Sequence, residues 1–176
     1  MPSMNDPWFA VFECDLYTRV LLREAVGEMM YLTPWAKQAS LSSYGSPDAC
    51  QAVVKAVLRR MYNFMMSWSR HNHAVIKDIH RPFFQPEAFR LEAGCTIWPS
   101  PDHIGILVPL GVYPAPIQLH PRGKDYVIPA YWHADTVIFL NETGLQFTGC
   151  GSVRFIYIML YKLATPQVTG WEVYVP

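Results

Sequence analysis

The sequence predicts an α+β fold in which N-terminal helices pack on a mostly antiparallel β-sheet formed by the C-terminal half. Helical spacing of apolar residues dominates residues 1–80, whereas prolines separate short apolar runs over residues 81–176. The spacers between those runs are too short for crossover helices, which favours antiparallel pairing. We expect one domain over residues 1–176, with 1–80 mainly helical and 81–176 mainly β.

The stretch Val153–Leu163 is expected to be the central strand, because it has β-branched and aromatic residues and no Gly or Pro. A helix of the same residues is the alternative, which the turn signals on both sides disfavour. Both faces are apolar, so both should be buried. One face carries Val153, Phe155, Tyr157, Met159, Tyr161 and Leu163, and the other carries Ile156, Ile158 and Leu160.

Residues 8–32 are expected to form the first helix, since apolar residues recur every three or four positions. Asp6 is a suitable N-cap with Pro7 in the first helical position, and Thr33-Pro34 should end the helix. Two strands stay possible at the beginning, because the run WFAVF is short and bulky.

The second helix is expected from about Pro47 to about Ser69. Ser46-Pro47-Asp48 supplies an N-cap, a proline in the first turn and an acid near the helix N-terminus. Its apolar face is wide and rich in methionine. That face either packs on the core or partly contacts another subunit.

The β half contains eight candidate strands, and the change in composition near His80–Pro86 marks where it begins. Turn signals lie at Asn141–Gly144 and Thr148–Gly151. The candidate strands are Cys95–Trp98, Ile104–Leu110, Ile117–His120, Asp125–Ile128, Thr136–Leu140, Gln146–Thr148, Val153–Leu163 and Glu172–Val175.

The composition favours a protein whose surface is partly covered by neighbours. Charged residues make up 16% of the chain, against about 25% in typical domains. Hydrophobic residues make up 51% and aromatic residues 14%. We therefore expect a non-enzymatic structural or protein-interaction subunit of a homo-oligomer or larger assembly, such as a virion component, or an inhibitor or immunity protein covering a partner. The candidate interaction surface is Met61, Met65, Trp68, Tyr113, Tyr131 and Trp132.

Several classes are disfavoured by charge and motif content. The net charge is zero, so neither nucleic acid nor a membrane is an expected partner. No apolar run is long enough to span a bilayer, and the acidic N-terminus lacks the basic region of a secretory signal, which favours an intracellular or virion location. The four cysteines have no C-x-x-C pair and are expected to be reduced. Phosphate-binding loops and hydrolase motifs are absent, and we expect no cofactor.

A small metal-dependent enzyme is the alternative. Its candidate ligands are His71, His73, Asp78 and His80, because two histidines separated by one residue can bind one metal from a strand or loop. This run resembles the His-x-His-x-Asp-His loop of the metallo-β-lactamase superfamily, but the acid and third histidine are displaced and the family's α/β pattern is absent. The other interpretation is the polar end of a helix.

A cysteine-dependent enzyme is the second form of this alternative. Cys150 lies between two glycines, where a turn can expose a thiol, and His120 or His133 would have to activate it. A turn with a small buried residue is the other interpretation. His133 and Asp135 could act as a base and its orienting acid, or form a hydrogen bond at a strand end.

Overall fold

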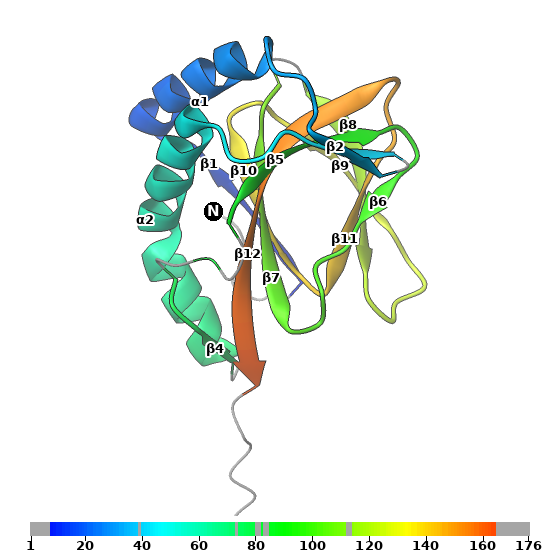
Figure 1. Ribbon diagram of the computed structural model, residues 1–176. Coiled ribbons are helices and arrows are strands. Elements are labelled where there is room, and N and C mark those ends of the chain that lie inside the picture. Colours follow the sequence, from blue (N-terminus) through cyan, green and yellow to red (C-terminus); the bar gives the residue numbers. More distant parts are fainter. Residues whose placement is uncertain are drawn as a thin grey trace, which may run out of the picture.

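A computed structural model describes residues 8–38, 40–72, 74–79, 82, 85–111 and 114–164. These residues form two helices, α1 (Leu16–Met29) and α2 (Asp48–His71), and twelve strands (Figure 1). The strands are β1 (Phe9–Glu13), β2 (Ala36–Gln38), β3 (Leu41–Ser43), β4 (Ala74–Ile76), β5 (Glu87–Glu92), β6 (Thr96–Ile97), β7 (His103–Pro109), β8 (Ala115–Pro121), β9 (Ile128–Trp132), β10 (Thr136–Asn141), β11 (Thr143–Phe147) and β12 (Ser152–Ala164).

The strands form two sheets instead of the single sheet expected. The large sheet has the order β1-β10-β7-β12-β5-β3-β2, with β4 also paired to β12, and the small sheet has the order β6-β11-β8-β9. Within the described residues every strand pairing is antiparallel. The prediction of N-terminal helices on a mostly antiparallel β structure is confirmed, and β12 is central as predicted.

The chain passes repeatedly from one sheet to the other, which gives a jelly-roll-like sandwich (Figure 1). The passage from β10 to β11 needs only Glu142, whose φ of 49° turns the chain sharply. Asn141–Gly144 was expected to be a hairpin or a turn. It is instead a corner between sheets, because Asn141 still pairs with β7 and Thr143 already pairs with β8.

Two hydrophobic cores lie on opposite faces of the large sheet. The first packs both helices against it and includes Ile156, Ile158 and Leu160 of β12. The second fills the space between the two sheets and includes Phe155 and Tyr157 of the same strand. The predicted alternation along β12 is therefore confirmed.

The first helix begins later than expected. Phe9–Glu13 form β1 at the edge of the large sheet, and α1 starts only at Leu16, where the side chain of Asp15 accepts a hydrogen bond of 2.9 Å from the N–H of Thr18. The expected cap at Asp6-Pro7 lies outside the described residues. The local spacing of apolar residues favours a helix here, but pairing with the distant β10 stabilises the extended conformation instead.

The second helix agrees with its prediction to within two residues at its C-terminal end. It runs from Asp48 to His71, with Pro47 as its N-cap and no side-chain capping bond, so Ser46 does not cap it. Its methionine-rich face is turned inward, and Met61, Met65 and Trp68 are buried in the first core. Across the described residues, neither helix is both long and apolar enough to cross a membrane.

Candidate functional site

The space between the two sheets is filled by apolar side chains. Trp132, Phe155, Leu145 and Phe147 are almost wholly buried there. The ring centroids of Trp132 and Phe155 lie 5.8 Å apart, and the Trp132 indole donates a 3.0 Å hydrogen bond to the carbonyl of Thr136. Two sheets that pack face to face lie close enough for the side chains of their inner faces to fill the space between them. This interior is therefore a packed core.

The phenol side chain of Tyr157 lies in this core. Its hydroxyl has no hydrogen-bond partner among the described residues, and burial raises the pKa of the phenol well above its usual value. Gly105 on β7 makes room for the ring, because a Cβ at that position would lie 2.9 Å from a ring carbon of Tyr157.

The predicted metal ligands are only partly described. His71 is exposed at the end of α2, and its Nδ1 lies 2.9 Å from the carbonyl of Ser67. Asp78 lies in the loop after β4 with a φ of 50°. His73 and His80 lie outside the described residues, so the metal site stays a prediction. No three His, Cys, Asp or Glu side chains come together within the described ranges.

The cysteine and the histidine–aspartate pair are not assembled as an active site. Cys150 is an exposed free thiol, not the small buried residue that the alternative expected. Asp135 pairs with Arg19 at 3.0 Å, while the backbone N–H and the hydroxyl of Thr136 donate to the carbonyl of His133. His120 lies 3.1 Å from the side-chain oxygen of Gln146.

The candidate interaction residues are scattered. Met61, Met65, Trp68 and Trp132 are buried within the chain's own cores, and Tyr113 lies outside the described residues. Tyr131 is 70% exposed on the outer side of the small sheet. Whether a partner covers this surface stays a prediction.

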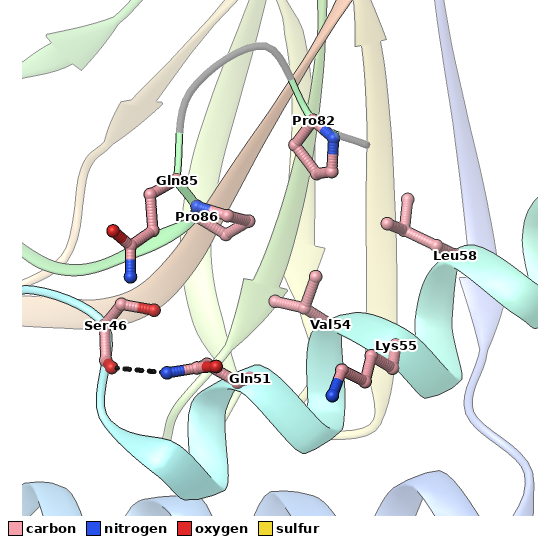
Figure 2. A pocket seen from close by; sticks show the side chains of 8 residues that line it. All are labelled: Ser46, Gln51, Val54, Lys55, Leu58, Pro82, Gln85 and Pro86. Carbon is pink, nitrogen blue, oxygen red and sulfur yellow. Dashed lines mark hydrogen bonds between the residues drawn. The ribbon is translucent and has the colours of Figure 1, made fainter. Parts of the chain in front are cut away.

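A groove lies between the first half of α2 and the segment before β5, and we call it the α2 groove (Figure 2). Its volume is about 360 Å³, within the range of small-molecule sites. One end carries polar side chains, and the other end is apolar apart from Lys55, which lies between Val54 and Leu58. The polar end has Ser46, Gln51 and Gln85, and the apolar end has Val54, Leu58 and Pro82.

The polar end of the α2 groove keeps much of its hydrogen-bonding capacity. The amide of Gln51 donates to the carbonyl of Ser46 at 3.2 Å, which fixes that side chain beside the start of the helix (Figure 2). Gln85 is exposed and has no side-chain hydrogen bond within the described residues. Lys55 also lines the groove and has no ion pair with a described residue. An amide, a hydroxyl and an ammonium can therefore contact a ligand whose apolar part lies on Val54 and Leu58.

The comparisons with known proteins identify the fold. The chain has the jelly-roll-like fold of 2OG-Fe(II) oxygenases. It matches a prolyl hydroxylase from Trichoplax adhaerens with a TM-score of 0.57 and 10% identity, over 90% of this chain and 85% of that one. A Pseudomonas putida prolyl-4-hydroxylase matches with a TM-score of 0.53 and 9% identity, over 88% of this chain and 92% of that one.

Other structures agree with this result. HygX from Streptomyces hygroscopicus, with nickel and 2-oxoglutarate bound, has a TM-score of 0.53 and 8% identity over 87% of this chain and 82% of that one. No protein-family model and no curated protein matches the chain. At these identities the likeness establishes the fold and leaves the substrate and the reaction to be argued from this chain's own residues.

The fold overturns the functional prediction. We expected a non-enzymatic structural or interaction subunit, for example of a virion, and the chain instead shares its fold over most of its length with oxygenases, which are enzymes. The inference from composition was wrong because many of the aromatic and aliphatic residues lie in two cores, one on each face of the large sheet. A low content of charged residues therefore does not by itself indicate that a partner protein covers the surface.

The described residues of the interior do not supply the ligands of a non-haem iron site. Non-haem iron oxygenases hold the metal with two histidines and one carboxylate. Among the described residues no such set converges, and the space between the sheets holds aromatic and aliphatic side chains. We therefore derive no reaction step through iron in this interior.

The α2 groove was not predicted from the sequence. Ser46, Gln51 and Gln85 are ordinary polar residues, and the last is far from the others along the chain. The pairing of Ala88 on β5 with Tyr44 and Gly45 through backbone hydrogen bonds brings the two segments together. The local signal in the sequence was the pair of prolines, Pro82 and Pro86, because proline fixes its own φ angle.

Proposed function

We propose that this chain is an enzyme of the oxygenase fold that acts on a small organic molecule bound in the α2 groove. The groove is the observation that carries the proposal. It combines an apolar floor with a few polar groups at one end, which is the usual composition of small-molecule sites. The likeness to oxygenases supports an enzyme that acts on such a molecule.

The chemistry of the groove defines the ligand class. Val54 and Leu58 favour an apolar body, while Ser46 and Gln85 favour a group that both donates and accepts hydrogen bonds. Lys55 adds one positive charge at an exposed position, where an ion pair contributes little. We infer a neutral or weakly acidic molecule that carries a hydroxyl, amide or carboxyl group at one end.

The metal ligands predicted from the sequence precede Pro82, a residue that lines the groove. His80 precedes Pro82 by two positions in the sequence, and Pro82 lines the groove. His71 lies thirteen residues beyond Leu58 on α2, which separates the two by about 20 Å at 1.5 Å per residue. His71 therefore cannot bind a metal beside this ligand. Asp78, His73 and His80 stay as candidates.

A fragment screen by two-dimensional NMR tests the binding proposal. We expect hits that shift the amide signals of Ser46, Gln51 and Gln85. Gln85→Ala should weaken such a ligand about fivefold, since one hydrogen bond contributes about 1 kcal/mol. Gln118→Ala is the matched control, because Gln118 lies on β8 outside the groove. A screen with no hit at the groove, or equal affinities for both variants, would contradict the proposal.

Turnover is measured separately. The protein with oxygen and a groove ligand is assayed, with and without Fe(II) and 2-oxoglutarate, for oxidised ligand and for succinate. Product formation that falls in Gln85→Ala and not in Gln118→Ala supports an enzyme working at this groove. Product formation that is unaffected by Gln85→Ala but abolished by His73→Ala would place the chemistry at the histidine segment and reject the groove as its site.

A further inference from the structure

A second groove lies between α1 and the turns at one end of the sheets, and we call it the α1 groove. Its volume is about 440 Å³. Leu22 and Val26 of α1 give it an apolar side, and the turn between β9 and β10 contributes Asp135. Unlike the α2 groove, it is lined by two guanidinium groups, those of Arg19 and Arg23.

Arg19 is held in a fixed position at this groove. Its Nε donates to the carbonyl of Cys14 at 2.9 Å, and its terminal nitrogen lies 3.0 Å from a carboxylate oxygen of Asp135. A guanidinium has five N–H donors, so these two contacts leave donors for a ligand. Because the ion pair anchors the side chain, little conformational entropy would be lost when a ligand binds.

Arg23 lies one helical turn beyond Arg19 on the same face of α1. It is exposed, lines the groove, and has no ion pair or hydrogen bond with any described residue. Two arginines four residues apart repel each other slightly in the absence of an anion. An anion between them would remove this repulsion.

The acids around the groove do not neutralise it. Asp135 is the one carboxylate among the described lining residues, and Arg19 already pairs with it. Glu28 of α1 accepts a hydrogen bond from the N–H of Ala49 and so points to α2. The groove therefore keeps the charge of Arg23 in excess.

We propose that the α1 groove is an oxyanion-binding site, in which Arg23 and the fixed Arg19 hold the phosphate or carboxylate group of a small molecule. Planar guanidinium groups bind such oxyanions through paired N–H donors. The apolar surface of Leu22 and Val26 then contacts the carbon part of the same molecule. This site is separate from the α2 groove and does not depend on the function proposed there.

Titration of the full chain with inorganic phosphate and, separately, with succinate tests this site. Amide signals and the arginine Nε–H signals of Arg19 and Arg23 are followed by NMR. We expect saturable shifts with at least one anion and an affinity about tenfold weaker in Arg23→Gln, as expected when a charged hydrogen-bond donor is lost. Saturation with phosphate alone identifies a phosphate group, and saturation with succinate alone identifies a carboxylate.

Arg59→Gln is the control, because Arg59 is exposed on α2 and lines neither groove. The affinity of Arg59→Gln for the anion should equal that of the wild type. Neither protein should show anion-induced shifts at Ser46 or Gln85. Equal loss of affinity in Arg23→Gln and Arg59→Gln would show non-specific charge attraction and overturn the proposal. Linear, non-saturating shifts with both anions would overturn it as well.

Discussion

Phe155→Ala tests whether the space between the sheets is a packed core. The Phe155 side chain is 0% exposed, and its ring lies 5.8 Å from that of Trp132 and 6.1 Å from that of Phe89. Losing the buried ring costs about 2 kcal/mol of transfer free energy. A remaining cavity of about 80 Å³ adds about 2 kcal/mol at 24 cal/mol per Å³. We expect unfolding to be easier by about 4 kcal/mol.

Equilibrium unfolding in urea, followed by circular dichroism, measures this loss. Tyr131→Ala is the matched control, because this aromatic residue is largely exposed on β9, and its loss should cost under about 0.5 kcal/mol. Benzene should raise the melting temperature of Phe155→Ala and leave the control unchanged, since a dry apolar cavity binds it. A loss below about 1 kcal/mol for Phe155→Ala would refute a tightly packed interior.

Three further predictions concern local features. Gly144→Ala should destabilise the fold by about 1–3 kcal/mol and change the tryptophan fluorescence, because the new Cβ would lie 2.5 Å from the ring of Trp98. Unchanged fluorescence and stability would contradict the close packing of Trp98 on Gly144. Asp15→Ala should cost about 1 kcal/mol at neutral pH through loss of the α1 cap. Hydrogen bonds from Thr18 lower the pKa of Asp15, so its contribution is present above the unfolded pKa and is lost as the pH falls through the folded one; a wild-type advantage that persists at pH 2 would contradict this. With a thiol reagent at pH 8, Cys150 should react within minutes and Cys14 only on unfolding, since burial raises the pKa of Cys14 to about 11; equal rates would contradict the burial.

The elements that the sequence predicted well are those in which apolar residues recur at a constant spacing over a long stretch. α2 keeps its helical spacing over 24 residues, and the side chains of β12 alternate between the two cores from Phe155 to Leu160. In both cases the local pattern and the tertiary packing agree, because each element has apolar residues wherever it meets a core. β1 shows the opposite case. Its local spacing favours a helix, and only pairing with β10, more than 120 residues away, makes it a strand.

The division into two sheets could not be read from strand patterns. β6 has only two residues, and β10 passes into β11 through the single residue Glu142. Neither length nor alternation says which sheet such a strand joins. The same limit applies to both grooves, since only tertiary packing brings Gln51 and Gln85 to one groove and Arg19 to Asp135.

We propose that this chain binds its small molecule in the α2 groove and not in the filled space between the sheets. Two-dimensional methyl and amide NMR with a ligand from the fragment screen tests this most directly. We expect shifts of the Ser46, Val54 and Gln85 signals and unchanged methyl signals of Leu145 and Leu107 between the sheets. Ligand-induced shifts confined to Leu145 and Leu107 would show a binding chamber between the sheets and contradict the proposal.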